Sequence, residues 1–311
     1  MTSLRNSLRM IGERNSYQSL RDLHSLPPSK AGFQDKSLSR AMFSMQSPKA
    51  TEWIKYAESE KEYESDDWTE ECQGVTTDGN HWYFSSNKEG KRAIYKFSAG
   101  MKKLVHFNAE QTGCKHVGDL DYSDGILYVA LEQPAKILAL KSDFSQWRTY
   151  PLQGIHPGTP SPQDNKLPWC AIHPWNGLLY SSRFDGVDEV YAYETKTFTL
   201  VKTLRLKRKI NRVQGGCISK NGHLLLASDD TSRIECFTTL NGHYRGGAHV
   251  QIDHDEVPPE EMEGITIWEG ISYGGRDTHI HVIVLDNDVS TPWDDDSIFF
   301  KHYTVPFPEL L

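Results

Sequence analysis

Short apolar, β-rich runs separated by polar turns fill the chain from about residue 72 onward. Five segments repeat one order: a small or polar start, a short strand, a tight turn ending in glycine, and a second β-rich strand. The turn glycines are Gly79, Gly125, Gly177, Gly222 and Gly270, spaced by 46, 52, 45 and 48 residues. Four of the turns carry Asp-Gly or Asn-Gly, which favour two-residue hairpins. In the fifth segment a longer connection follows the glycine before the next β-rich run begins at His279.

Each of the first four hairpins is followed by two further β-rich runs. These runs are 93–97 and 104–107, 137–140 and 147–152, 190–193 and 200–206, and 234–237 and 248–252. No amphipathic pattern longer than two helical turns interrupts them. Four antiparallel strands per unit, at a period in the forties, predict an all-β fold, a β-propeller. A β-sandwich of hairpins is the alternative, but it gives no reason for a regular four-strand period.

The number of blades follows from the same count. The last repeat supplies only three strands, 264–268, 279–286 and 298–305. A closed ring needs a fourth strand, because an unpaired edge invites aggregation. The β-like run nearest the start of the repeats is Glu52-Trp-Ile-Lys-Tyr-Ala, so we expect residues 51–57 to be the outer strand of the last blade. This predicts five blades; six is the alternative if residues 40–70 contain a degenerate blade.

In a propeller, the start of each first strand and the end of each second strand emerge on the same face. The predicted strand starts are Gln73, His116, Trp169, Gln214 and Glu263. The predicted strand ends are Asn87, Glu132, Arg183, Asp229 with Asp230, and Asp286 with Asn287 and Asp288. Almost every blade thus places an amide, an acid, an arginine or a histidine at one axial mouth, which indicates a ligand site there.

Each candidate residue has more than one interpretation. Gln73 and Gln214 either satisfy backbone groups in the channel or contact a ligand. His116 can be a base, a metal ligand or a hydrogen-bonded core residue. Trp169 suits stacking on a sugar but also suits plugging the channel, and Asn87 is a candidate substrate contact. Arg183 is the only cation in the set, so it is the candidate for holding a carboxylate or phosphate.

The acidic residues carry the main chemical alternatives. Glu132, Asp230, Glu263 and Asp286 or Asp288 could jointly supply the oxygen ligands that Ca²⁺ prefers. Crowded carboxylates also raise one another's pKa values, so a neutral acid that donates a proton without metal is a second possibility. Scattering of these residues over separate surface loops is the third.

The first fifty residues differ from the rest of the chain. They hold ten serines and a net charge of about +5, with few apolar residues. We expect a disordered arm over 1–50 and a single propeller domain over 51–311. The arm could tether a protein partner, and an organelle transit peptide is an alternative to a cytoplasmic location. The acidic stretch that follows, 52–71, is interpreted as a solvated connection.

Composition and charge exclude several classes. The chain has 34 basic and 42 acidic residues, a net charge of −8, which argues against binding to nucleic acid. No run approaches the length of a membrane span, and the chain starts without an apolar signal region. Five cysteines, without zinc spacing, indicate free thiols in a reduced compartment. No phosphate-binding loop, dinucleotide fingerprint or serine-hydrolase elbow is present.

The Glu263-Gly264 strand start and the Ser228-Asp229-Asp230 strand end resemble acidic positions of the senescence-marker/gluconolactonase-like propellers. The resemblance covers about residues 72–305. It implies a divalent cation, usually calcium, at the axis and hydrolysis of lactones or esters. Glu263 and Asp230 would then be cation ligands, with Asn87 or Asn287 as amide ligands.

The sequence therefore predicts an enzyme that acts on a small polar or carbohydrate-like substrate at the axial mouth. A cation or Arg183 would neutralise substrate charge, while His116 or an acid, Asp230 or Glu263, would move the proton. Polysaccharide lyase or glycosidase chemistry without metal remains open. The alternative to an enzyme is a non-catalytic propeller that binds a ligand or a protein partner.

Overall fold

The computed structural model describes residues 55–56, 61–63, 67–163, 166–252, 260–273, 276–286 and 297–305. All of them belong to one compact unit that spans residues 46–311. The predicted arm over 1–50, the candidate ligand Asn287 and Asp288 lie outside the described residues.

Four sheets follow chain order, each with four antiparallel strands. Blade 1 contains β3 (Cys72–Thr77), β4 (His81–Ser86), β5 (Ala93–Ser98) and β6 (Lys103–Asn108). Blade 2 contains β7 (His116–Ser123), β8 (Ile126–Glu132), β9 (Lys136–Lys141) and β10 (Trp147–Pro151). Blade 3 contains β11 (Ala171–Ile172), β12 (Leu178–Ser182), β13 (Val187–Glu194) and β14 (Leu200–Ile210). Blade 4 contains β15 (Val213–Ile218), β16 (His223–Ser228), β17 (Arg233–Thr238) and β18 (Tyr244–His249).

Blade 5 joins the two ends of the propeller region. Its three C-terminal strands are β19 (Glu261–Tyr273), β20 (Arg276–Asp286) and β21 (Ser297–Thr304). Two short segments, β1 (Lys55–Tyr56) and β2 (Lys61–Tyr63), pair antiparallel with β21 as the outer strand. The expected closure by a strand within 51–57 is confirmed for β1, and the chain forms five blades.

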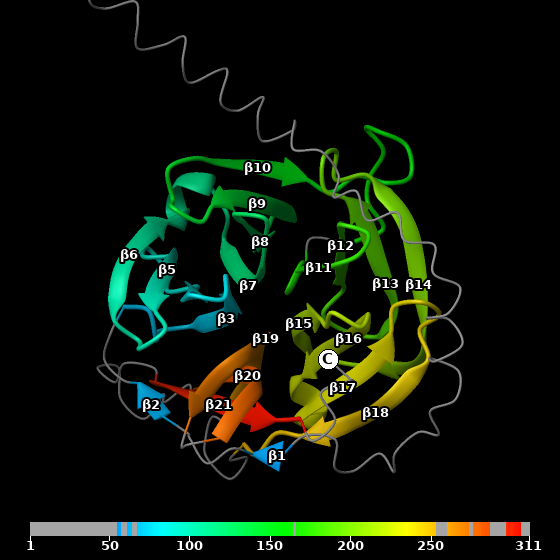
Figure 1. Ribbon diagram of the computed structural model, residues 1–311. Coiled ribbons are helices and arrows are strands. Elements are labelled where there is room, and N and C mark those ends of the chain that lie inside the picture. Colours follow the sequence, from blue (N-terminus) through cyan, green and yellow to red (C-terminus); the bar gives the residue numbers. More distant parts are fainter. Residues whose placement is uncertain are drawn as a thin grey trace, which may run out of the picture. The chain divides into compact units, whose positions relative to one another are not determined.

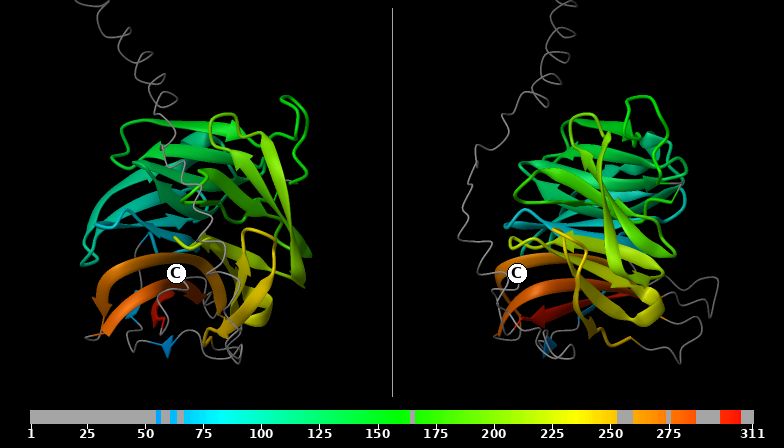
Figure 2. Two further views of the ribbon diagram at one scale, coloured as in Figure 1. Left: turned by 45° about the vertical axis from the view of Figure 1, so that its right-hand side comes forward. Right: turned by 90° about the vertical axis from the view of Figure 1, so that its right-hand side faces the viewer.

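The first strand of every blade lies nearest the axis (Figure 1). Strands β3, β7, β11, β15 and β19 contact one another across the centre as well as around the ring. Side views show the twist of the strands within the blades (Figure 2), the twist that L-residues impose on any sheet. The starts of the inner strands therefore meet at one place, as a propeller requires.

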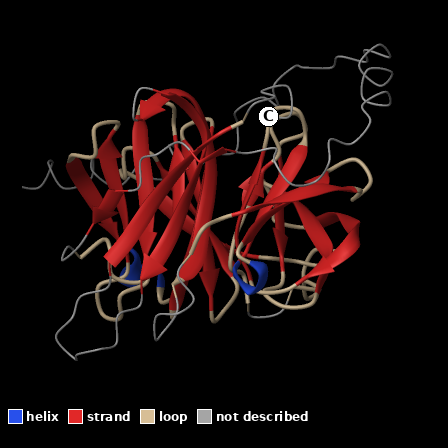
Figure 3. Cartoon of the chain, turned by 90° about the horizontal axis from the view of Figure 1, so that it is seen from below, coloured by secondary structure: helices blue, strands red, loops and turns tan. Residues whose placement is uncertain are grey.

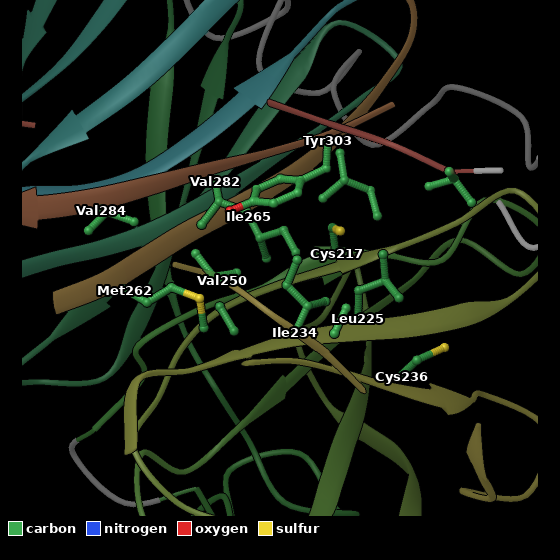
Figure 4. Packing of buried hydrophobic residues seen from close by; sticks show 14 of the residues in the cluster. Cys217, Leu225, Ile234, Cys236, Val250, Met262, Ile265, Val282, Val284 and Tyr303 are labelled. Carbon is green, nitrogen blue, oxygen red and sulfur yellow. The ribbon is translucent and has the colours of Figure 1, made fainter. Parts of the chain in front are cut away.

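The hydrophobic core is divided into five clusters, one between each pair of neighbouring blades. The cluster between blades 4 and 5 includes Leu225, Ile234, Met262, Val282 and Tyr303 (Figure 4). Each blade thus buries both faces against its neighbours, which explains why its strands are rich in apolar residues on both faces. Five clusters in a closed series are the packing expected of a five-bladed ring.

Four of the five predicted hairpin glycines occupy their turns in the left-handed region. Gly79, Gly125, Gly177 and Gly222 have φ between +65° and +84°. Gly270 is different: its φ is +87°, but it lies inside β19 at a register shift, and the strand continues to Tyr273. The predicted turn at this glycine is therefore wrong. Glycine serves a β-bulge as readily as a turn, and the Glu-Gly dipeptide lacks the Asp or Asn of the other four.

The outer strand of blade 4 also begins earlier than predicted. We expected residues 248–252, but β18 spans Tyr244–His249 and includes two glycines. A Cβ on Gly247 would lie 2.5 Å from an Oε atom of the buried Glu235. Gly247, one of the two glycines that hid this strand from the sequence pattern, thus leaves room for a buried acid against the backbone.

Helical structure within the described residues is limited to two short 3₁₀ turns, η1 (Ala109–Thr112) and η2 (Asp229–Thr231) (Figure 3). None of the described helices has the length and apolar character of a membrane span. All five cysteines are buried and unpaired. Burial raises the pKa of each thiol. The cysteines therefore pack as small apolar residues and are not reactive thiols.

Candidate functional site

Three inner strands begin with the same short pattern: a charged residue, a buried residue, Gln or Glu, and glycine. The pattern occurs at 71–74 in blade 1, 212–215 in blade 4 and 261–264 in blade 5. The first and third residues of each pattern line one cavity, which is described below. The second residues, Cys72, Val213 and Met262, are buried in the blade interfaces.

The glycine of each pattern allows the inner strands to approach closely. A Cβ on Gly264 would lie 2.5 Å from the Cα of Gly74, and one on Gly215 would lie 2.5 Å from the carbonyl oxygen of Glu263. Real side chains do not fit at such distances, so only glycine is accommodated. The close approach brings the preceding Gln and Glu side chains of three blades into one space.

That space is a polar cavity of about 270 Å³ at the start of the inner strands. Four blades supply most of its polar side chains, and the segment before β11 supplies the remainder. The cavity is lined by Glu71, Gln73, His116, Glu132, Lys166, Pro168, Phe184, Arg212, Gln214, Glu261 and Glu263.

The structure brings together five of the predicted site residues. They are Gln73, His116, Glu132, Gln214 and Glu263. Two of them contact each other directly, because the side-chain amide of Gln214 donates a hydrogen bond of 2.9 Å to Oε1 of Glu263. The predicted strand starts thus converge, with one exception.

The exception is Trp169, which lies beneath the cavity rather than in its lining. Its indole is fully buried, and its Nε1–H donates to Oγ of Ser182 at 2.9 Å. A Cβ on Gly216 would meet ring atoms of Trp169 at 2.5 Å. Of the two alternatives for Trp169, the structure places it in packing, away from any ligand in the cavity.

Five of the six described candidates at strand ends also lie outside the cavity lining. Asn87 uses its side-chain oxygen to accept from Arg92 Nε and from the Val117 N–H, both at 3.1 Å. The exposed Arg183 donates to the carbonyl oxygen of Pro162 at 3.1 Å. These two side chains are engaged in local structure.

Asp230 is exposed at the end of the second strand of blade 4 and lies 3.5 Å from the side-chain amide of Asn211. Glu132 is the one described strand-end candidate in the cavity lining. It is 8% exposed, and its Oε1 accepts from the Leu167 N–H at 2.8 Å. Asp286 is the last residue of β20 and is not among the residues that line the cavity.

Sequence reasoning missed the charged residues two positions before Gln73, Gln214 and Glu263. These are Glu71, Arg212 and Glu261. The repeated charged-x-Glx-Gly pattern was present in the sequence at three strand starts, and this repetition could have revealed them. Lys166 and Phe184 were missed for another reason: they come from connections with no repeat, and Lys166 Nζ lies 4.7 Å from the centre of the Phe184 ring.

Glu263 has the most unusual environment among the acids of the cavity. Its side chain is 2% exposed, and it faces Glu261, Asp229, Glu71 and Asp119. Burial, followed by the repulsion of these acids, raises the pKa of Glu263 well above 4.5. Burial and the crowding of acids thus both favour the protonated form of this carboxyl group.

Arg212 is a cation of the cavity wall, together with Lys166, and provides the arginine that was expected of Arg183. One guanidinium nitrogen lies 2.7 Å from Glu261 and 2.9 Å from Asp229. Its backbone has φ +44°, and Glu71 at the equivalent position of blade 1 has φ +49°. Non-glycine residues in this region are strained, and such strain collects at functional sites.

His116 is a neutral imidazole in the cavity wall. Burial, with the nearby positive charge of Arg92, lowers the pKa of His116 to about 4. Its buried Nδ1 has no hydrogen-bond partner among the described residues. A neutral ring with an unused nitrogen can accept or donate a proton, depending on its tautomer.

The expected calcium ligands do not assemble in the described residues. Of the four, only Glu132 and Glu263 line the cavity, and one oxygen of each already accepts a hydrogen bond. No group of three or more His, Cys, Asp or Glu side chains in the described ranges has the arrangement of a metal site. Within the described residues, the ligand set implied by the resemblance is therefore not brought together, and its amide candidate Asn287 lies outside them.

We expect the raised pKa of Glu263 to appear in the pH dependence of stability. The folded chain binds a proton at this residue that the unfolded chain releases above about pH 4.5. The stabilisation from this proton is therefore present at low pH and lost as the pH rises through the folded-state pKa. Wild type should lose stability relative to Glu263→Gln as the pH rises, measured from urea unfolding midpoints at successive pH values. Parallel curves for the two proteins would contradict the assignment.

The fold and the cavity together define a five-bladed β-propeller with a polar axial site. No protein-family model matches the chain, and no curated protein matches its sequence. Among solved structures it is similar to glutaminyl cyclase from Myxococcus xanthus, with a TM-score of 0.54 and 15% identity over 81% of this chain and 97% of that one. A luciferin-regenerating enzyme matches with a TM-score of 0.40 and 14% identity over 79% and 98%. The first likeness supports the propeller fold.

Proposed function

We propose that the axial cavity is the active site of an enzyme that uses acid–base chemistry, without a metal, on a small polar substrate carrying an amine or amide. The observation that carries this proposal is the burial of Glu263 in the cavity wall among other acids, which raises its pKa well above 4.5. A carboxylic acid kept neutral near pH 7 can donate a proton to a leaving group. Surface carboxylates lack this ability at neutral pH.

The remaining cavity residues support a substrate of this class. The acids Glu71 and Glu261 favour a positively charged amine, and the amides Gln73 and Gln214 can pair with a substrate amide. His116 offers a neutral imidazole as the proton acceptor. The cavity is small enough to select a terminal residue or a small molecule rather than a chain threading through it.

Cyclisation of a glutaminyl group, the reaction in the name of the similar Myxococcus xanthus structure, fits this chemistry. The amine nitrogen attacks the side-chain amide carbon, a ring C–N bond forms, the bond to the amide nitrogen breaks, and ammonia leaves. The amine loses one proton and the departing nitrogen gains one. In our proposal His116 accepts the first proton and Glu263 supplies the second.

Lactone or ester hydrolysis assisted by calcium, which the gluconolactonase-like resemblance implies, is tested in parallel. The experiment uses the full-length protein with two probes, a glutaminyl dipeptide assayed by ammonia release and gluconolactone assayed by acid release. Each assay is run with EDTA and with added calcium. We expect ammonia release in EDTA that is lost in Glu263→Gln.

Three other results would overturn the proposal. Lactone hydrolysis that needs calcium would replace it with metal-assisted hydrolysis. Turnover that is the same in wild type and Glu263→Gln would place the chemistry elsewhere. Saturable binding of the dipeptide or the lactone with turnover of neither would favour a non-catalytic binding propeller.

A further inference from the structure

Below the cavity, one buried carboxylate receives hydrogen bonds from several blades. Asp119 lies in β7 and is fully buried. Its Oδ1 accepts from the Val75 N–H at 3.1 Å and from the Leu120 N–H at 2.8 Å, and its Oδ2 accepts from the Gly216 N–H at 3.1 Å. The backbone of Ile265 is a fourth hydrogen-bond donor. Asp119 thus connects blade 2 to blades 1, 4 and 5.

The three donors from other blades occupy equivalent positions. Each lies two residues after a Gln or Glu that lines the cavity: Val75 after Gln73, Gly216 after Gln214, and Ile265 after Glu263. One carboxylate therefore holds the backbone at the same point of the repeated pattern in three blades.

We propose that Asp119 is the positioning residue of the axial cavity, because its carboxylate fixes the three strand starts that present Gln73, Gln214 and Glu263. It does not touch a ligand itself. Its effect passes through the backbone of the inner strands.

The packing around Asp119 shows how narrowly this arrangement is fixed. A Cβ on Gly74 would lie 2.6 Å from both Cα and Oδ1 of Asp119, and one on Gly215 would lie 3.0 Å from Oδ2. The glycines thus give the carboxylate access to the backbone of the neighbouring blades. Leaving any of these buried N–H groups without an acceptor would be costly, so the carboxylate and the strand starts depend on each other.

The two acceptor oxygens of Asp119 matter as well as its shape. Burial raises the pKa of Asp119 well above 3.8, although its N–H donors favour the ionised form and act in the opposite direction. All donors to the two oxygens are N–H groups, and asparagine would replace one acceptor oxygen with an NH₂ group that faces them. Repulsion from Asp119 also contributes to the raised pKa of Glu263.

Asp121, two residues further along β7, provides a matched comparison. Its Oδ2 accepts from the Ile172 N–H of blade 3 at 2.6 Å, and its Oδ1 accepts from Thr76 Oγ1 at 3.3 Å. Asp121 is therefore a second carboxylate between blades, but its backbone partner does not follow a cavity residue of the repeated pattern. Replacing it should loosen the axis without releasing the three strand starts.

The experiment compares Asp119→Asn, Asp121→Asn and Leu120→Ala in the full chain by NMR. Leu120→Ala removes a buried side chain of the same strand and controls for general loss of stability. We expect amide hydrogen exchange at Val75, Gly216 and Ile265 to be at least about tenfold faster in Asp119→Asn than in Leu120→Ala. The Glu263 carboxyl signal should also titrate at lower pH in Asp119→Asn than in either control.

Equal exchange at the three amides in Asp119→Asn and Leu120→Ala would overturn the inference, as would an unchanged Glu263 titration. If Asp119→Asn does not fold, the inference is tested on the wild-type protein. NMR couplings across the hydrogen bonds should then connect the Asp119 carboxyl carbon to the amide nitrogens of Val75 and Gly216. Absence of these couplings would overturn the inference. The inference deepens the proposed function by concerning the same site, but no readout needs a substrate. Failure of the enzyme assays and failure of this inference are therefore distinguishable.

Discussion

Replacing Glu263 with glutamine is expected to lower kcat/KM on the glutaminyl dipeptide by about 10²- to 10⁴-fold, the usual contribution of a general acid. Glutamine keeps the size of the side chain and the carbonyl oxygen that accepts from Gln214. It removes only the acidic proton. The loss should therefore appear in kcat, with a much smaller change in KM, because binding contacts remain.

The matched control is Glu269→Gln on the same strand. Glu269 pairs with Lys220 at 2.6 Å near the opposite end of β19 and is not in the cavity lining. Its variant should retain wild-type kinetics. Equal loss in both variants would show that removing a glutamate from β19 damages the fold rather than the chemistry.

The second large effect is expected for Gly264→Ala. The added Cβ would lie 2.5 Å from the Gly74 Cα, 2.7 Å from the Val75 nitrogen and 2.9 Å from the Gly74 carbonyl carbon. All three are backbone atoms of the neighbouring blade, so no side chain can rotate away. We expect a loss of about 3 kcal/mol in the free energy of unfolding, the upper end for overpacked cores. For a domain of this size each kcal/mol lowers Tm by about 2–4 °C.

Gly100→Ala is the control for the introduction of a methyl group. Its added Cβ would meet only the Ser98 hydroxyl at 3.9 Å, an ordinary contact on an exposed turn. Its effect should stay within about 0.5 kcal/mol. A Gly264→Ala protein as stable as this control would contradict the tight packing of blades 1 and 5 at the axis.

The sequence was most informative where structure is local. Asp78-Gly79 and Asn176-Gly177 specify hairpins through their own backbone preferences, so their repetition revealed the blades and their number. The failure at Gly270 has the same origin: a left-handed glycine serves a turn or a bulge, and only pairing with β20 distinguishes them. The outer strand of blade 4 was misplaced because Gly247 reflects a contact with Glu235, which lies on another strand.

The site was predicted in part for a geometric reason. Strand starts such as Gln73 and Gln214 belong to the inner strands and reach the axis directly. Strand ends such as Arg183 and Asp230 belong to second strands, which lie about 4.8 Å farther from the axis. Among the described strand ends Glu132 alone reaches the lining. The spacing of residues along the chain does not reveal this difference in distance from the propeller axis.

The order of polar and apolar residues by itself determined the repeated four-strand unit, the closure of the ring near residues 51–57 and the convergence of the inner strand starts, because hairpin turns and alternation depend on neighbouring residues. Only the tertiary structure decided that Arg212 takes the place expected of Arg183, that Trp169 is covered, and that the pKa of Glu263 is raised. Those properties depend on the distance between side chains of different blades and on the water that packing excludes. Neither quantity is encoded in any single stretch of the chain.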